Sequence, residues 1–252
     1  MQSAIAFTPE PDVRGERASG LLLTESGSLA LRQPNLLSVL SPSQRDAIVG
    51  RSRRRHYPVD TPIFAQGEDH DGIFLIESGR IRVFYTSPSG REITLAYWNA
   101  GNFVGGPDIF GGGAHMWSGT AVMPTGVLVL HGPTLKQFAL EIPALALGII
   151  EALSFKGRCY STLAQILGTR SITERMMQLV LQLTELYGVR TAEGTRIDYP
   201  LSHAELAQMV GATRQWVTTT LNRLKAAGVL IHAAGIITVL DAAKLRRAVF
   251  RE

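Results

Sequence analysis

The feature that most constrains the fold is a series of short β-branched and aromatic segments that are separated by glycines at nearly equal intervals. Gly67, Gly79, Gly90 and Gly101 lie 12, 11 and 11 residues apart. The segments are TPIFAQG, GIFLIESG, RIRVFYTSPSG, REITLAYWNAG, NFVGG, SGTAVM and GVLVLHG. Short strands at this spacing are typical of an antiparallel sandwich or barrel rather than of alternating strand–helix units. The stretch 87–90 (SPSG) predicts a hairpin turn, because proline fixes φ and glycine tolerates a positive φ.

The sequence becomes helical after Pro143. Residues 143–168 contain no internal proline, and small or apolar residues recur at the 4-3-4-3 spacing of a coiled-coil seam. We therefore expect a long dimerisation helix; packing on the chain's own sheets is the alternative. The expected interface residues are Ile150, Leu153, Gly157, Tyr160, Ala164 and Leu167. The capping box 171–174 (SITE) predicts a new helix, which makes the Gly168–Thr169 break a candidate hinge.

The C-terminal part contains the pattern of a DNA-reading helix-turn-helix. A second capping box, 202–205 (SHAE), opens a short helix that Gly211 ends, and Thr213 caps the next helix to about Ala226. That helix turns its apolar stripe inward and its polar start outward. The stretch 229–240 then predicts a two-stranded wing. The expected DNA-binding residues are Ser202, His203, Thr213, Arg214, Gln215, Trp216, Thr218, Thr219 and Arg223.

The charge distribution agrees with binding to a polyanion. The chain has a net charge of +4, and residues 170–252 carry 11 Lys or Arg against seven Asp or Glu. The single cysteine, Cys159, excludes an internal disulfide and a Cys₄ cluster, and we expect it to be a buried small hydrophobic residue. No apolar run is long enough for a membrane span, so we expect a cytoplasmic protein without a membrane partner. No catalytic constellation or metal-ligand set occurs, so we expect no enzyme and no metal site.

These parts, in this order, resemble the cyclic-AMP receptor/fumarate-nitrate regulator (CRP/FNR) superfamily of bacterial transcription factors. The β-roll resembles the family at PIFAQGE, FLIESGRIRVF, GREITL and GNFVGG, and the helix-turn-helix at LSHAELAQMVGATRQWVTTTLNRLKAAGVL. The resemblance implies an α+β fold with an antiparallel, jelly-roll-like β-roll sensor, a long dimerisation helix and a winged helix-turn-helix. It also implies a homodimer on a palindromic DNA operator, RNA polymerase as a partner, and a small-molecule effector.

The expected domain boundaries follow from these segments. Residues 1–34 form an arm without sustained periodicity, and residues 35–142 form the β-roll. Residues 143–168 form the dimerisation helix, and residues 169–252 form the DNA-binding domain. The basic run 51–56 (RSRRRH) is interpreted as a solvated strand face, with contact to polymerase or bent DNA as the alternative.

The expected effector site departs from the family pattern. Cyclic-nucleotide members carry a Glu after Phe-x-Gly and an Arg before Ser/Thr-Ala, whereas this chain has Gly106 and Gly119 there. Without an arginine for the phosphate, the sequence argues against cyclic AMP, and one cysteine argues against an iron–sulfur cluster.

The residues expected around the pocket leave three alternatives open: aromatic residues that only pack the roll, with His115 in water; an organic effector; or haem, bound through His115, or another metal. A constitutive DNA-binding protein with a ligand-free roll is the alternative function. The candidate pocket residues are Trp98, Gly105, Gly106, His115, Trp117 and Thr120.

Overall fold

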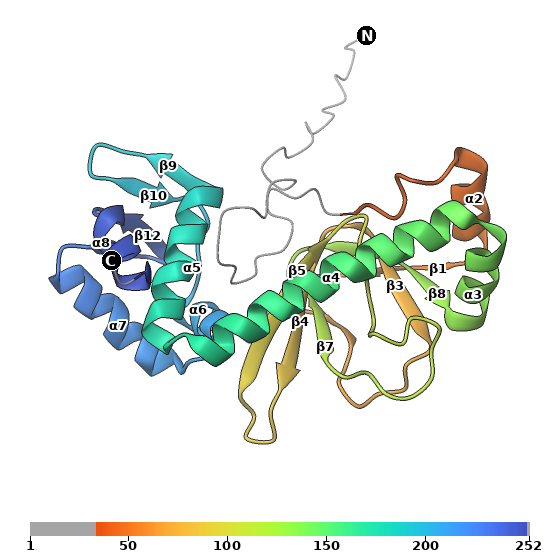
Figure 1. Ribbon diagram of the computed structural model, residues 1–252, viewed down its shortest axis with the longest axis horizontal. Coiled ribbons are helices and arrows are strands. Elements are labelled where there is room, and N and C mark those ends of the chain that lie inside the picture. The colour runs from red at the N-terminus through yellow and green to blue at the C-terminus, as the bar shows by residue number, and fades with distance from the viewer. Residues whose placement is uncertain (1–33, 251–252) are drawn as a thin grey trace, which may run out of the picture.

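The computed structural model describes residues 34–250, so the predicted arm lies outside the described residues except for Pro34. The N-terminal part is a β-roll of two four-stranded antiparallel sheets (Figure 1). The first sheet has the order β1 (Arg53–Tyr57), β8 (Thr125–His131), β3 (Gly72–Ser78) and β6 (Phe103–Val104). The second has the order β2 (Pro62–Phe64), β7 (Ser118–Ala121), β4 (Arg80–Thr86) and β5 (Glu92–Asn99). The predicted antiparallel fold class is confirmed.

The glycine-bounded segments form strands because their alternate side chains meet between the two sheets. Ile76, Ile81 and Trp98 are fully buried there. The predicted hairpin joins β4 to β5, and Gly90 has the positive φ of +78° that the turn requires. Strand β1 exposes Arg53–His56, as the interpretation as a solvated strand face predicts.

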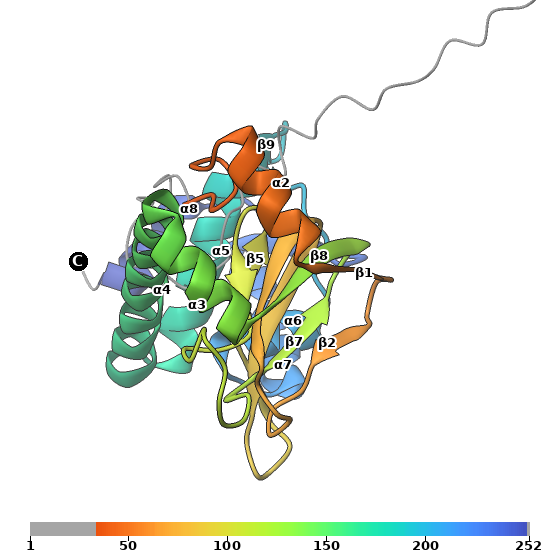
Figure 2. The same ribbon diagram turned by 90° about the vertical axis from the view of Figure 1, so that its right-hand side faces the viewer.

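Three helices pack against the roll: α2 (Pro42–Gly50), α3 (Gly132–Glu141) and α4 (Pro143–Thr169). Helix α4 runs along the roll, and α2 and α3 lie at the end away from the C-terminal unit (Figure 1 and Figure 2). Ser41 caps α2 in a capping box with Gln44. No single helix in the described part is long and apolar enough to span a membrane; α3 and α4 reach that threshold only together and are bent by 118° at their junction.

The C-terminal unit is a winged helix-turn-helix with an enlarged sheet. Its helices are α5 (Ile172–Tyr187), α6 (His203–Val210), α7 (Arg214–Ala226) and α8 (Ala242–Phe250). Its sheet has the order β11 (Leu230–Ala233), β12 (Ile236–Val239), β10 (Thr195–Ile197) and β9 (Gly188–Arg190). The predicted wing is β11–β12, which turns at Ala234-Gly235 with both φ angles positive. Sequence periodicity did not predict β9 and β10, because strands of three residues are too short to show it.

The C-terminal unit packs against the second sheet of the β-roll. Gln208 on α6 donates a hydrogen bond of 3.1 Å to Glu92 on β5, and Glu92 also pairs with Arg82 at 2.7 Å. Tyr97 of β5 is 6% exposed and belongs to the core of the C-terminal unit. The two units therefore share a packed interface in this arrangement.

Candidate DNA interface and effector cavity

The helix-turn-helix is built by local capping. Ser202 and Glu205 form the predicted capping box at the start of α6. Gly211 ends α6 in the left-handed conformation, with φ 67° and ψ 46°, which favours glycine. The Thr213 hydroxyl then accepts a hydrogen bond from the Trp216 N–H and starts α7. These three local signals place α7 after α6 with a turn of three residues.

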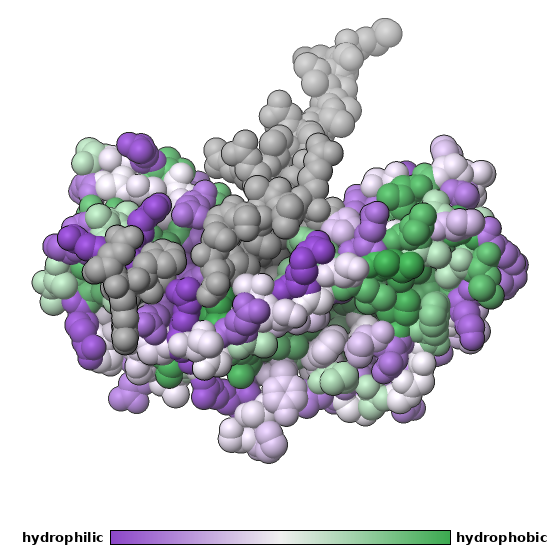
Figure 3. Space-filling view, in the orientation of Figure 1, coloured by the Kyte–Doolittle hydropathy of each residue, from purple (hydrophilic) through white to green (hydrophobic). Residues whose placement is uncertain are grey.

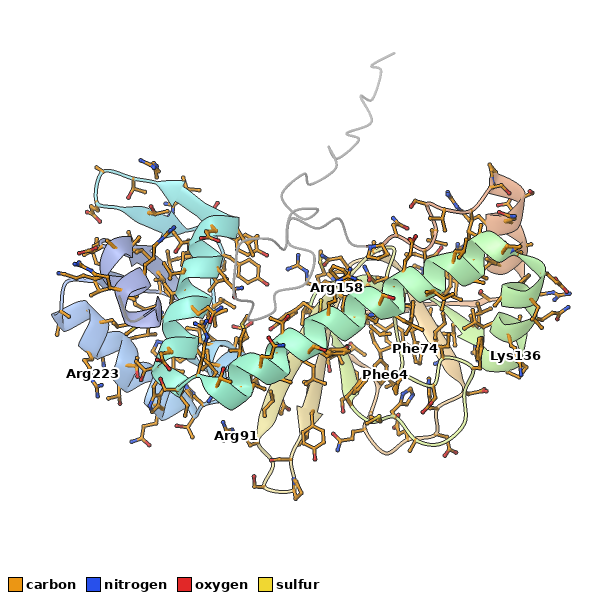
Figure 4. All side chains as sticks on the ribbon, in the orientation of Figure 1. Phe64, Phe74, Arg91, Lys136, Arg158 and Arg223 are labelled. Atoms are coloured by element: carbon orange, nitrogen blue, oxygen red, sulfur yellow. The ribbon has the colours of Figure 1, made fainter. Side chains whose placement is uncertain are left out.

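Helix α7 has one buried and one exposed face. Val217, Leu221 and Leu224 are buried in the core of the C-terminal unit. The exposed residues include several that the sequence predicts for DNA contact: Thr213, Arg214, Gln215, Thr219 and Arg223. Figure 1 shows α7 along the outer edge of the unit, and Figure 4 labels Arg223 on it. Arg214 and Gln215 occupy the first turn, where a recognition helix reaches base edges.

The other predicted contact residues are engaged in local contacts, and all but Ser202 are half-buried. Trp216 is partly buried against the core, and the Ser202 hydroxyl accepts the cap hydrogen bond from Glu205 N–H. His203 Nδ1 lies 2.7 Å from Thr218 Oγ1, and the Thr218 hydroxyl donates to the Arg214 carbonyl. This arrangement favours the tautomer in which His203 Nδ1 carries the proton and donates to Thr218 Oγ1. These side chains position the start of α7.

The wing joins the same network through His232 on β11. His203 Nε2 and His232 Nδ1 are 3.3 Å apart, so His232 donates to His203. Desolvation lowers the pKa of His232, and the neighbouring His203 and Lys225 lower it further. A chain of hydrogen bonds thus runs from the wing to the first turn of α7.

Helix α4 has two different faces. Its buried stripe packs on the roll and then on the C-terminal unit, and it includes Ile149, Phe155 and Cys159. Cys159 is buried, as expected. The residues expected in the dimer seam flank this stripe and are exposed or half-buried; Leu153, Tyr160 and Leu167 still pack in part against the cores of the two units. Ile150 is 57% exposed, and Figure 3 shows a hydrophobic area over the N-terminal half of α4.

A cavity of about 190 Å³ lies between the roll and α4. It brings together four of the six predicted pocket residues: Trp98, Gly105, Gly106 and Trp117. Its wall also includes Leu153, Gly157 and Tyr160 from α4, which belong to the expected seam. The cavity therefore touches both the sensor sheet and the expected dimer interface.

His115 and Thr120 do not line this cavity, so their expected place in the pocket is corrected. His115 is 5% exposed, which also corrects the expectation that it sits in water. Its ring stacks on Phe64 at 4.6 Å between centroids and lies 4.6 Å from the ring of His70, and its Nδ1 lies 2.5 Å from the Gly105 carbonyl. Backbone hydrogen bonds hold the glycine loop 111–113 and His115 against residues 68–70, which brings His115 beside the ring of His70. Among the described residues, no group of three potential metal ligands comes together.

Neighbouring side chains fill the space that a glutamate at position 106 or an arginine at position 119 would need. A Cβ on Gly119 would lie 2.4 Å from Cε1 of Phe64, which is buried and cannot move freely. A Cβ on Gly106 would lie 3.2 Å from Nε2 of the buried His70. Any longer side chain at Gly119 therefore requires the core to repack.

Sequence reasoning missed Lys156, which lines the cavity and is 8% exposed. Its Nζ lies 3.3 Å from the ring centre of Trp98 and 5.1 Å from that of Phe103. Desolvation by burial lowers its pKa to about 7. The sequence could have predicted that Lys156 is buried, because Ala152, Lys156 and Cys159 follow the helical spacing of the buried stripe of α4.

Two family models match the chain on either side of α4. A cyclic nucleotide-binding domain matches residues 54–141, and a Crp-like helix-turn-helix domain matches residues 174–248. The Cyclic AMP receptor protein of Thermus thermophilus is 28% identical over 211 residues, which cover 84% of this chain and 94% of that protein. A CRP-like cAMP-activated global transcriptional regulator of Mycobacterium tuberculosis is 23% identical over 218 residues, covering 86% of this chain and 97% of that protein.

Solved structures show the same fold. The CooA mutant from Carboxydothermus hydrogenoformans superposes with a TM-score of 0.69 at 23% identity, covering 85% of this chain and 95% of that chain. The c-di-GMP responsive regulator CLP of Xanthomonas campestris gives a TM-score of 0.72 at 21% identity, covering 80% of this chain and 100% of that chain. With both family models in the expected order and relatives matched over nearly their whole length, the chain belongs to the CRP/FNR superfamily of bacterial transcription regulators.

Proposed function

We propose that this regulator acts as a homodimer that binds a palindromic DNA operator, and that an effector other than cyclic AMP or an iron–sulfur cluster controls it. The single observation that carries the proposal is the exposed polar first turn of α7, with Arg214 and Gln215 outward and their backbone braced by the wing. The proposed location is the cytoplasm, where such an operator lies. No catalytic step is part of the proposal.

The outward face of α4 supports a dimer. Leu147 and Ile150 are 61% and 57% exposed, although a lone helix gains nothing from such apolar residues in water. Gly157 and Ala164 on the same face let two helices approach closely. Two linked recognition helices can then read half-sites about 34 Å apart.

Three observations support an effector other than cyclic AMP. The arginine and glutamate positions of the family hold Gly119 and Gly106, and buried rings crowd both. The cavity of about 190 Å³ is smaller than most ligand sites, which span roughly 300–1,000 Å³. The similarity to the relative named Cyclic AMP receptor protein therefore supports the fold of this chain, but we do not infer from it that cyclic AMP is the effector.

An iron–sulfur cluster lacks its thiolate ligands, because Cys159 is the single cysteine of the chain and burial raises the pKa of its thiol to about 11. The ring of His115, the residue considered for haem, stacks on Phe64 and does not line the cavity. RNA polymerase remains a proposed partner, with the exposed basic strand β1 as the candidate contact.

Binding-site selection from random DNA, with the full chain, tests the proposal. We expect the selected sites to be palindromes with half-site centres one helical turn apart, and sedimentation to give a dimer. Selection of no sequence, or of single half-sites by a monomer, would contradict it. A sequence-specific dimer that no metabolite extract stabilises would favour the alternative of a constitutive DNA-binding protein.

A further inference from the structure

Lys156 places an amino group in an apolar wall. It lies midway along α4 on the face that packs on the roll, and its neighbours are the rings of Trp98 and Phe103. Among residues 34–250, no carboxylate forms an ion pair with it. Tyr160 is the other ionisable residue of the cavity wall, and Cys159 is the one titratable group with an electrostatic effect on the pKa of Lys156 among the described residues. Burial raises the pKa of both Tyr160 and Cys159.

A buried charged lysine without an acidic partner destabilises the folded state, so a lysine at this position calls for a functional explanation. Removing an ammonium group from water is unfavourable, and the cation–π contact with Trp98 offsets only part of that cost. A methionine has a similar length and would fill the same space without that cost. An anionic group of a ligand could pair with Lys156 from the cavity, because the Lys156 side chain lines the cavity and is more than nine-tenths buried.

The size and walls of the cavity restrict that partner. A volume of about 190 Å³ is slightly larger than a cavity of about 150 Å³ that accepts benzene. It therefore suits about one ring or a short alkyl chain together with a small charged group. Trp98, Trp117 and Tyr160 present apolar ring surface to it, and no acidic residue lines it.

We propose that the cavity binds a small organic carboxylic acid, whose carboxylate pairs with Lys156 Nζ and whose apolar body packs against Trp98, Trp117 and Tyr160. This inference rests on the proposed function only in taking the cavity as the effector site. Leu153, Gly157 and Tyr160 belong both to the cavity wall and to the proposed dimer seam. Occupancy by such an acid would therefore act directly on the arrangement of the α4 pair.

The proposal predicts that binding takes up a proton above neutral pH. In the free protein, burial lowers the pKa of Lys156 to about 7, and a bound carboxylate raises it again. Above pH 7 the ammonium group must be formed on binding. The affinity should then fall by about tenfold per pH unit, while below pH 7 it should be constant.

Fluorescence titration and calorimetry with matched probe pairs test the proposal. The probes are benzoate against benzamide and hexanoate against hexanamide, with the full-length protein at pH 6.5. We expect at least one carboxylate to bind about tenfold or more tightly than its amide, since a charge-assisted contact is worth roughly 1.5–3 kcal/mol. In Lys156→Met, this preference should fall below about twofold; in the exposed control Lys136→Met, it should be unchanged.

Calorimetry in two buffers of different ionisation enthalpy gives a second measurement that needs no variant. At pH 8, wild-type protein should take up nearly one proton for each carboxylate bound. Equal binding of acid and amide, absence of binding by both acids, or a preference that survives in Lys156→Met would overturn the inference. Operator binding is measured in parallel. If it persists without carboxylate binding, only this inference fails; if carboxylates bind but no operator is selected, the proposed function fails.

Discussion

At the residue scale, Arg214 is the side chain most suited to direct base readout. It is exposed in the first turn of α7, and its guanidinium can bind guanine O6 and N7 in a bidentate manner. Arg214→Ala should cost about 1–3 kcal/mol per half-site and relax the preference at one guanine. Binding-site selection with the variant checks this. Arg223→Ala is the matched control, since a phosphate contact would weaken binding on all sequences alike. Selection of the same guanine by Arg214→Ala would show that α7 is docked differently.

Lys156 makes a second prediction at this scale, on stability against pH. In the unfolded chain its amine is protonated below its ordinary pKa of 10.5, whereas in the folded chain burial lowers the pKa to about 7. Between these values the unfolded state binds more protons, so the free energy of unfolding rises with pH. Urea denaturation from pH 7 to 9.5 should show this rise in wild type and a smaller one in Lys156→Met. The variant should also be more stable than wild type at pH 7. Equal pH slopes would mean that the Lys156 ammonium is solvated.

At the element scale, α4 is predicted to carry the dimer interface on its outward face. Ile150 is 57% exposed and does not line the cavity, so Ile150→Glu should leave the fold of one protomer intact. In a dimer, however, the carboxylate would be buried against an apolar partner helix. Sedimentation should then show a monomer, and operator affinity should fall by at least about tenfold, because a single recognition helix loses its linked partner.

Val59→Glu serves as the control for this element, because Val59 is 52% exposed in the loop between β1 and β2. It should stay dimeric. If Ile150→Glu sediments as a dimer at low concentration, the seam lies on another surface.

At the scale of the whole molecule, the proposed function requires the two units and α4 to act together, with an effector that decides which arrangement is populated. In this arrangement the C-terminal unit rests on β5 through the Gln208–Glu92 hydrogen bond and through Tyr97. An effector shifts such an equilibrium only if it binds one arrangement more tightly.

Cyclic AMP should not be such an effector for this chain. Gly119 leaves its phosphate without an arginine, and Phe64 fills the space beside that position. Calorimetry with cyclic AMP at millimolar concentration should give no binding heat, and fluorescence anisotropy should show unchanged operator affinity. Micromolar binding would contradict this interpretation of the pocket.

The sequence by itself determined the order of parts in this protein. Glycine spacing predicted the strands, and capping residues predicted the starts of α5, α6 and α7. The absence of an internal proline and the apolar periodicity predicted the long helix α4, but not which stripe of it is buried. All these signals are local, since a cap or a stripe depends on residues within a few positions of each other. The sequence also showed directly that positions 106 and 119 hold glycines, and thus no charged side chain for a cyclic nucleotide.

The tertiary structure alone decided which side chains meet. It enclosed His115 among Phe64 and His70, although sequence proximity to Trp117 had placed it in the pocket. It also placed Lys156 against Trp98, 58 positions earlier in the chain, where no short-range pattern relates a lysine to an aromatic residue. Burial, and with it the pKa and chemistry of a charged group, depends on distant segments that pack together, and local sequence contains no record of that packing.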